Sequence, residues 1–458
     1  MPQRERVFCL DVILESRIGD CQEREEGTSY RIVRPFAADP SVGNAGNEWA
    51  FQDGVHRFPW RNSLKRQALS LMQISTLEFI PVSVPYTHRE VSSLVNRDGV
   101  TDIIVKATTE DGLVGWGESC SGADVVSVMG ALKAMVPFVK GRSPWDSERI
   151  REELWHRGIW SWRQHTACFA YPGIDMALWD ICGKSCNQPL YNLFGGKVRD
   201  RANYFYYCSQ GTNEHVAEQA RDGVKKGFHV FYLKVGLDIE AELRMVQTLR
   251  ETIGPQAKIR LDANGAWNVN QALRNLARLD EFNIDFIEQP VVQDPITNMQ
   301  EVRRHCNIAL SANEGLWTAE DAYRQITGRT ADVYCFSPYF NGSLAQFQRL
   351  SWLAHYEGLQ ICRHTHGELG ITAAACHHIL LTLPNIVEGN QQTAHMMTDD
   401  IVVETIPIAD GPDWGVPGGS GIGVEVNQDK LRKYHQLYLE RGQFTPYDPS
   451  TIGTPLYR

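Results

Sequence analysis

The chain has 458 residues, of which 43% are hydrophobic and 22% are charged, and its formal net charge is −10. This length is more than a single hydrophobic core serves, so two or more domains are expected. An acidic chain has no general attraction for nucleic acid or an anionic membrane, and no apolar run approaches the roughly 20 residues of a membrane span. We therefore expect neither partner.

The cysteines and the N-terminus indicate the compartment. The eleven cysteines follow no repeated spacing, and the chain opens on charged residues. Such a start makes a poor signal peptide, so we expect free thiols in a cytoplasmic protein.

Residues 1–72 are expected to form an N-terminal extension. The segment contains a loop-like stretch at 41–47, followed by the aromatic residues Trp49, Phe51, Phe58 and Trp60. This pattern favours a structural arm or an oligomer contact over an active-site lid.

Residues 73–195 predict an α+β domain. Strands are expected over 74–81 and 101–108, and a turn at Asp111 and Gly112 leads the second strand into a partner. The stretch 82–99 between the two strands is polar, and we expect an irregular loop there. Helices are expected over 125–139, 147–156 and 172–186.

Residues 196–405 alternate short apolar runs with helix-like segments. The eight expected strands are 204–208, 230–235, 259–262, 286–288, 309–312, 333–337, 360–364 and 386–388. Eight strands with helices between them predict a parallel α/β barrel. The last part, 406–458, begins with a Gly/Pro-rich stretch at 412–423 and is expected to return to the first domain.

Three carboxylates stand at equal steps of 26 residues: Asp262, Glu288 and Glu314. Each follows an apolar run, and the step matches one strand–helix unit of a barrel, so the three acids are expected to meet at one barrel mouth. Three negative charges repel one another unless a cation holds them. Oxygen ligands favour a hard ion, so we expect one Mg²⁺ per site.

Lys234 and His364 end two other expected strands and complete a possible reaction centre. Removing a hydrogen next to a carboxylate creates a doubly charged enolate, whose charge a divalent ion offsets. A nearby cation also lowers the pKa of a lysine, so Lys234 could be neutral and take the proton. His364 on the opposite face would return a proton to carbon or give one to a leaving hydroxyl.

The chain resembles the enolase superfamily, in its mandelate racemase/muconate lactonizing enzyme branch, over about residues 73–430. The motifs that carry the resemblance are at 173–180, 188–196, 233–236, 262–265, 287–290 and 418–424. The resemblance implies a modified (β/α)₇β TIM-type barrel with an N-terminal α+β capping domain. It also implies Mg²⁺ binding by the three acids and a role as base for Lys234.

The resemblance further implies which residues bind the substrate. These expected substrate-binding residues are Tyr232, Asn264, Glu388, His366, Tyr86 and His88. The loop 82–99, with Tyr86, His88 and Arg89, would close the pocket, and Glu388 resembles an eighth-strand acid that binds the substrate carboxylate.

Two positions depart from the family pattern. Tyr232 replaces the first lysine of a common Lys-x-Lys motif, and Ser337 stands where relatives have a second lysine or an aspartate. His364 matches the histidine of the acid-sugar dehydratases, whereas a mandelate-like register would select His366.

From these observations we expect Mg²⁺-dependent removal of the α-proton from a small carboxylic acid, leading to dehydration of an acid sugar. One alternative is a racemase, epimerase or cycloisomerase in which Lys234 and His364 act as opposed bases. Another is a non-catalytic paralogue, which Tyr232 and Ser337 favour and the intact set of acids disfavours. The family's habit implies a homo-oligomer.

Overall fold

A computed structural model describes residues 72–120, 122 and 124–451. The expected extension over residues 1–72 therefore lies outside the described part, except for Met72. None of the described helices is both long and apolar enough to cross a bilayer.

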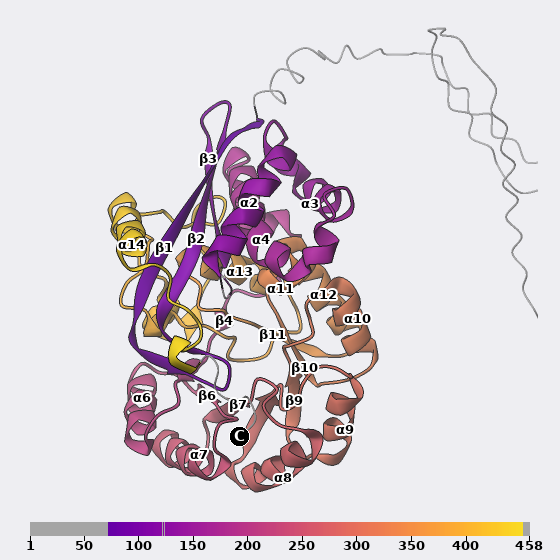
Figure 1. The fold of residues 1–458 in the computed structure, drawn as a ribbon, viewed down its shortest axis with the longest axis vertical. Coiled ribbons are helices and arrows are strands. Elements are labelled where there is room, and N and C mark those ends of the chain that lie inside the picture. Colours follow the sequence, from indigo (N-terminus) through magenta and orange to yellow (C-terminus); the bar gives the residue numbers. More distant parts are fainter. Residues whose placement is uncertain (1–71, 121, 123, 452–458) are drawn as a thin grey trace, which may run out of the picture. The chain divides into compact units, whose positions relative to one another are not determined.

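The first described domain is a three-stranded antiparallel sheet covered by helices (Figure 1). Its strands and α-helices are β1 (Ile74–Val91), β2 (Asn96–Thr109), β3 (Val114–Cys120), α2 (Val125–Val139), α3 (Ser147–His156), α4 (Gln164–Ser185) and α5 (Leu190–Leu193). The 3₁₀ turns η1 (Pro144–Asp146) and η2 (Trp160–Arg163) precede α3 and α4. Asp124 caps the N-terminus of helix α2, and its carboxylate accepts the backbone N–H groups of Val126 and Ser127.

Two expectations for this domain were wrong. The stretch 82–99 is not an irregular loop, because β1 and β2 extend through it and pair as far as Val91 and Asn96. Of its polar residues, Glu90 and Arg97 contact the barrel, whereas Arg89 and Asp98 pair with each other at the exposed surface. Helix α4 begins at Gln164 rather than at 172, and Pro172 lies inside it. The helix is buried along most of its length, and this packing outweighs the local preference of proline for a helix start.

Strand β3 and helix α4 approach each other through glycine. A Cβ atom added to Gly117 would lie 1.9 Å from the carbonyl oxygen of Gly173. Only a residue without a side chain allows the strand to lie this close to the helix.

The second domain is a parallel barrel, as the sequence predicted. Its seven strands lie in the order β11-β10-β9-β8-β7-β6-β5. They are β5 (Tyr206–Cys208), β6 (Val230–Lys234), β7 (Lys258–Asp262), β8 (Ile284–Glu288), β9 (Ala309–Ala312), β10 (Val333–Phe336) and β11 (Gln360–Arg363). The α-helices between and after them are α6 (Asn213–Lys225), α7 (Ile239–Ile253), α8 (Val269–Leu279), α9 (Thr297–His305), α10 (Ala319–Thr327), α11 (Pro338–Asn341), α12 (Leu344–Tyr356) and α13 (Gly370–Leu381).

The expected eighth strand is irregular. Ile386 pairs in parallel with Ile361 of β11, and Asn390 pairs in parallel with Tyr204, as isolated bridges that join the two edges of the seven-stranded sheet. The fold is therefore a TIM-type barrel of the modified (β/α)₇β kind, with an α+β cap over it.

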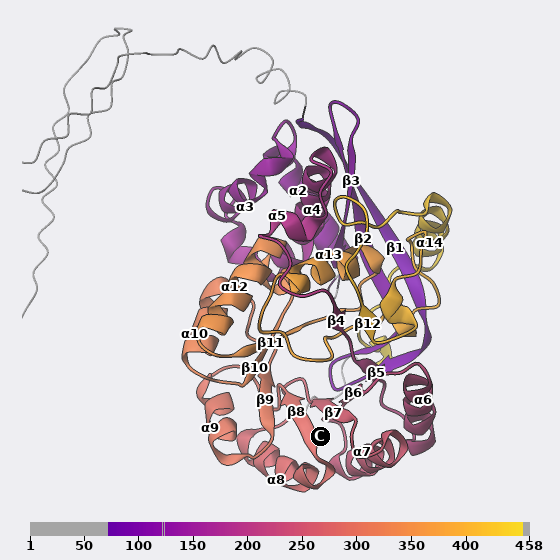
Figure 2. The ribbon, with the colours of Figure 1, turned by 180° about the vertical axis from the view of Figure 1, so that it is seen from behind.

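The chain then returns to the cap (Figure 2). The short strand β12 (Asp413–Trp414) pairs with β4 (Ala202–Asn203), and α14 (Gln428–Arg441) packs beside β1. After α14, the ring of Phe444 lies against Gly99 of β2, and the carbonyl of Pro446 accepts the N–H of Asn96. The C-terminal segment thus supports the β1–β2 hairpin from one side.

Candidate active site

The predicted lysine and acids lie at the carboxyl ends of four adjacent barrel strands. Lys234 of β6 is in register with Asp262 of β7, and Asp262 is in register with Glu288 of β8. Glu314 follows the end of β9 by two residues. Parallel strands end at one face of a barrel, so the local strand pattern brings these side chains together.

Asp262 and Asn264 connect the members of this group. The Asp262 carboxylate accepts hydrogen bonds from the Tyr232 hydroxyl at 2.6 Å and from Lys234 Nζ, both at Oδ2. Asn264 accepts a hydrogen bond from Lys234 Nζ at 3.1 Å and donates one to Glu314 at 2.9 Å. Its backbone has φ +46°, a left-handed conformation that asparagine tolerates better than most residues. This turn directs the amide between the lysine and the acid.

Burial and mutual repulsion disfavour the charged form of two of the acids. The pKa of Glu288 is raised well above its ordinary range by burial and then by the charge of Asp262. The same two causes raise the pKa of Glu314 to about 7. Burial alone would lower the pKa of Lys234, but the carboxylates of Asp262 and Glu288 outweigh it and the pKa is raised.

This group has the chemistry of a cation site. Glu288 Oε1 and Glu314 Oε2 are buried oxygens with no hydrogen-bond partner among the described residues. Unpaired buried carboxylate oxygens are costly, and a divalent ion satisfies them while it offsets the repulsion. Within the described part of the chain, no three acid, histidine or cysteine side chains are already gathered in metal-binding geometry. The Lys234 ammonium contacts Asp262 and places a positive charge beside that acid.

The two histidines follow β11 and lie in an aromatic environment. The rings of His364 and His366 are 4.5 Å apart, and Phe340 lies 4.7 Å from the first and 4.8 Å from the second. Burial, the neighbouring His366 and the Lys234 charge lower the pKa of His364 well below its ordinary range. Burial likewise lowers the pKa of His366 to about 3. Both imidazoles are therefore neutral near neutral pH.

The β1–β2 hairpin contributes an ion pair that sequence reasoning missed. The buried Glu90 and the largely buried Arg97 form an ion pair at 2.7 Å. Glu90 also accepts the Tyr207 hydroxyl of β5 at 3.0 Å, and Arg97 donates to the carbonyl of His366 at 2.7 Å. The hairpin is thus attached to two sides of the barrel mouth. Because 82–99 was expected to be a loop, no strand spacing indicated that these two residues face the barrel.

The other hairpin residues predicted for the site lie apart from the carboxylates. The guanidinium carbon of Arg97 lies 5.6 Å from the ring centre of Tyr86. The buried hydroxyl of Tyr86 has no hydrogen-bond partner among the described residues. A Cβ on Gly367 would lie 2.4 Å from that hydroxyl, which puts Tyr86 beside the histidine loop. His88 instead packs against His215 at the start of α6, with ring centres 5.6 Å apart.

Glu388 lies away from Lys234 and the three acids, whereas Gln391 contacts one of them. The Glu388 carboxylate pairs with His229 at 2.6 Å and with Lys258 at 3.0 Å, next to the amino ends of β6 and β7. This is the end of the barrel opposite the acids. Gln391, three residues further along, donates to Glu288 at 2.7 Å. Its only sequence signal was its place just after the expected eighth strand.

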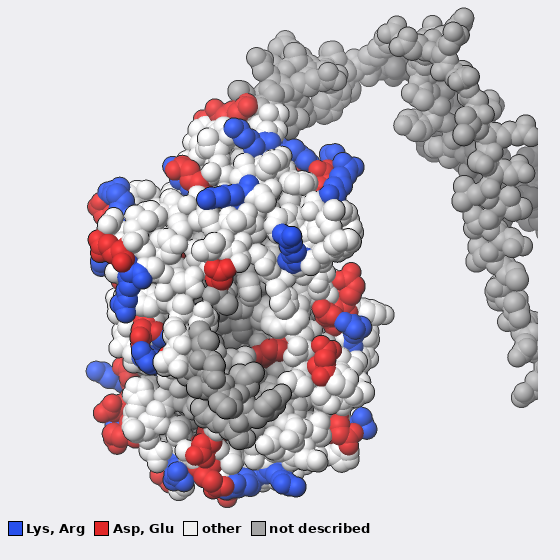
Figure 3. Space-filling view, in the orientation of Figure 1, with Lys and Arg blue, Asp and Glu red and all other residues white. Residues whose placement is uncertain are grey.

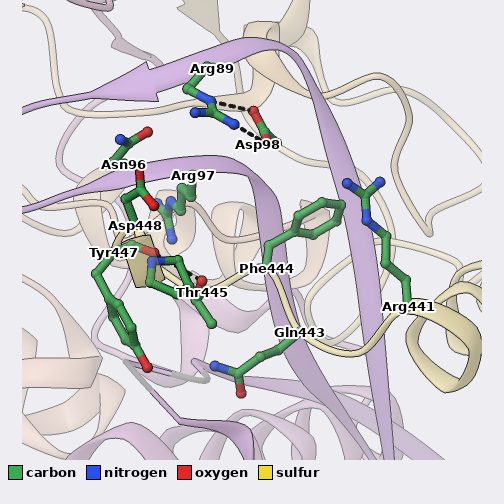
Figure 4. A pocket seen from close by; sticks show the side chains of 11 residues that line it. Arg89, Asn96, Arg97, Asp98, Arg441, Gln443, Phe444, Thr445, Tyr447 and Asp448 are labelled. Atoms are coloured by element: carbon green, nitrogen blue, oxygen red, sulfur yellow. Dashed lines mark hydrogen bonds and ion pairs between the residues drawn. The ribbon is translucent and has the colours of Figure 1, made fainter. Parts of the chain in front are cut away.

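A separate cavity of about 210 Å³ lies between the β1–β2 hairpin and the segment that follows α14 (Figure 4). Its lining includes Arg441 and the salt bridge of Arg89 with Asp98, which measures 2.8 Å. Arg97 also lines it, so the cavity adjoins the hairpin without containing the barrel acids. On the face seen in Figure 3, basic and acidic side chains are interspersed and form no single basic patch.

Two family models match the chain. Residues 81–195 match the mandelate racemase/muconate lactonizing enzyme N-terminal domain, and residues 215–430 match the enolase C-terminal domain-like family. The two matches cover most of the described cap and most of the barrel.

Individual relatives cover most of the chain at modest identity. An N-succinyl-L-Arg/Lys racemase of Bacillus cereus is 27% identical over 79% of this chain and 98% of that protein. An L-Ala-D/L-Glu epimerase of Bacillus subtilis is 27% identical over 77% of this chain and 97% of its own length. An arabinonate dehydratase of Saccharolobus solfataricus is 26% identical over 72% of this chain and 90% of that protein.

Solved structures share the fold. A putative sugar isomerase of Streptomyces coelicolor, described as an enolase, has a TM-score of 0.75 and 28% identity, covering 81% of this chain and 99% of its own. A dipeptide epimerase of Enterococcus faecalis, solved with magnesium and the dipeptide L-Leu-L-Tyr, has a TM-score of 0.72 and 24% identity. It covers 77% of this chain and all of its own.

Proposed function

Because the chain belongs to the mandelate racemase/muconate lactonizing enzyme branch of the enolase superfamily, we propose that it removes the α-proton of a small carboxylate with the help of Mg²⁺. The observation that carries this proposal is the joining of Lys234 to Asp262 and Asn264 beside Glu288 and Glu314. Relatives of this chain include racemases, epimerases, cycloisomerases and a dehydratase.

In this proposal Asp262, Glu288 and Glu314 hold the ion. The unpaired oxygens of Glu288 and Glu314 support their assignment. Bound there, Mg²⁺ would neutralise the second negative charge that forms on the substrate when its α-proton leaves.

Lys234 is the base in this proposal. The neighbouring acids raise the pKa of Lys234, so its ammonium is charged and pairs with Asp262. A divalent ion that engages Asp262 would withdraw this partner and disfavour the ammonium. The amine would then accept the α-proton, and Asn264 Oδ1 would keep it oriented by accepting a hydrogen bond.

We further propose dehydration of an acid sugar as the overall reaction. The unlike chemistry of the two candidate acid–base groups supports it, because Lys234 ends β6 and His364 follows β11. The position at the end of β10, where some relatives have a second lysine, is Ser337, and its hydroxyl accepts the N–H of Tyr339 at the start of α11. His364 would pass a proton to the departing β-hydroxyl, which requires that the bound substrate carboxylate first raise the lowered pKa of this histidine so that the imidazole takes up a proton.

A second candidate is racemisation or epimerisation at the α-carbon. Its support is the neutral state of His364, whose lowered pKa lets the imidazole accept a proton as a second base. The racemase and epimerase among the relatives have the same order of identity as the dehydratase.

The two candidates differ in what they do to the substrate in deuterium oxide. We would incubate the protein and Mg²⁺ with separate panels of mono- and diacid sugars, N-succinyl amino acids and dipeptides, followed by mass spectrometry. Dehydration predicts loss of one water from an acid sugar. Epimerisation predicts deuterium at the α-carbon and no loss of water.

Lys234→Met is the decisive variant, because it keeps an unbranched side chain and removes the amine. We expect it to lower turnover by at least 10²- to 10⁴-fold, the usual contribution of a positioned base. Lys106→Met is the matched control, since Lys106 pairs with Glu78 on the exposed cap. Full turnover by Lys234→Met, or deuterium exchange that needs no divalent ion, would contradict the proposal.

A further inference from the structure

Gln391 is fully engaged by its surroundings. Its side-chain Nε2 donates to Glu288 Oε2 at 2.7 Å, and its Oε1 accepts the backbone N–H of Thr365 at 3.2 Å. Its backbone exchanges hydrogen bonds with Arg363, from Gln391 N–H to the Arg363 carbonyl at 3.1 Å and from Arg363 Nη1 to the Gln391 carbonyl at 2.9 Å. The side chain is therefore held between an acid of the barrel and the loop that carries the histidines.

The contact with Gln391 makes the hydrogen bonding of the two Glu288 carboxylate oxygens unequal. Oε2 receives the Gln391 amide and, at 3.5 Å, the thiol of Cys335. Oε1 is buried and has no hydrogen-bond partner in the described part of the chain. An acid with one oxygen tied and the other unpaired presents a single oxygen in a fixed direction.

We propose that Gln391 is a positioning residue that directs Glu288 Oε1 toward a divalent cation and couples the histidine loop to that acid. The inference rests on the proposed function, because it assumes that the acids bind Mg²⁺. Residues that hold a metal ligand from behind set its orientation, and their loss costs roughly 10- to 100-fold in metal affinity. The coupling follows from the Thr365 N–H, since the same amide of Gln391 contacts both parts of the site.

The next residue offers a matched comparison. Gln392 is also buried, at 1% exposure against 3% for Gln391. Its amide donates to the carbonyl of Phe205 at 2.9 Å, is 2.9 Å from His395 Nδ1, and accepts the N–H of Ala394 at 2.7 Å. None of these contacts involves a barrel acid, so Gln392 has a structural role of similar extent without the link to Glu288.

The test is Mg²⁺ binding to the full chain by isothermal titration calorimetry, without substrate. We expect Gln391→Met to weaken Mg²⁺ binding about 10- to 100-fold. Gln392→Met should bind Mg²⁺ within about twofold of the wild-type protein, because it does not share a partner with the acids. Gln391→Asn, which keeps an amide but is one methylene too short to reach Glu288, is the second variant if the methionine does not fold.

The outcomes separate the two proposals. If the wild-type protein does not bind Mg²⁺, the metal premise of the proposed function fails, and the inference fails with it. If the wild-type protein binds Mg²⁺ and the Gln391 variants bind it equally well, the positioning role is wrong and the proposed function stands. Equal weakening by Gln391→Met and Gln392→Met would also overturn the inference, because the loss would then reflect general damage to this region.

Discussion

Replacing Asp175 by asparagine should make the protein more stable at neutral and alkaline pH. Asp175 is fully buried in α4, where Oδ2 accepts the N–H of Leu344 at the start of α12 at 2.8 Å and Oδ1 accepts the Ser147 hydroxyl. Burial, and then the charge of Glu148, raises its pKa from 3.8 to about 7. The side chain therefore links the cap to the barrel in its neutral form.

The magnitude follows from the two pKa values. A folded-state pKa above the unfolded value gives stability that is complete below pH 3.8 and is lost as the pH rises through about 7. The difference is about three pH units, and each corresponds to about 1.4 kcal/mol, so the loss approaches about 4 kcal/mol by pH 8. Asparagine resembles the neutral acid in shape and hydrogen bonding but does not ionise, so Asp175→Asn should avoid this loss.

Urea unfolding of both proteins at pH 4, 6 and 8 measures this effect. We expect equal stability at pH 4 and an advantage for Asp175→Asn that grows to about 4 kcal/mol at pH 8. Asp98→Asn is the control with the opposite sign, because the hydrogen bond from Arg89 lowers the pKa of that exposed carboxylate. A difference between wild type and Asp175→Asn that stays constant from pH 4 to pH 8 would refute the reasoning.

Three further predictions test the cap, the hairpin and the far end of the barrel. Gly117→Ala should destabilise the protein by about 1–3 kcal/mol or more in urea unfolding, because its Cβ would meet a backbone oxygen at 1.9 Å. The control, Gly130→Ala on the open face of α2, should be neutral or stabilising. Equal effects of the two substitutions would contradict the prediction of a steric clash at Gly117. Arg97→Met should cost about 3–5 kcal/mol by leaving Glu90 buried without its cation, and a double variant with Glu90→Gln should recover part of that loss. Glu388→Gln should leave kcat/KM within about twofold of wild type, since the partners of Glu388 lie at the amino ends of the strands. A large loss of kcat/KM in steady-state assays would instead show that Glu388 takes part in the active site.

The barrel was readable from the sequence because its periodicity is local. Each expected strand is a short apolar run, and the buried strands β6 to β11 lie within a few residues of the predicted positions. The equal steps between Asp262, Glu288 and Glu314 follow from the length of one strand–helix unit, so spacing alone predicted that they would meet. The resemblance to a modified barrel implied that one of the eight strands would be irregular without saying which, and in the structure it is the expected strand over 386–388.

The secondary structure of the cap was predicted less accurately from the sequence, for two physical reasons. Polar residues at 82–99 resembled a loop because the faces of an antiparallel hairpin that meet water or an active-site mouth need not be apolar. Pro172 resembled a helix start because its local preference is strong, and only burial of α4 between the sheet and neighbouring helices outweighs it.

By itself, the sequence determined the fold class and the residue types at the mouth of the barrel, since both depend on the order of elements along the chain. Only the tertiary structure decided which residues beyond the three evenly spaced acids share their site. Glu388 and Gln391 are three residues apart, yet the first pairs with Lys258 at one end of the barrel and the second with Glu288 at the other. Likewise, Glu90 and Arg97 reach the barrel only through the hairpin that β1 and β2 form. Such contacts depend on where irregular segments cross the barrel, and no periodic pattern along the chain encodes that path.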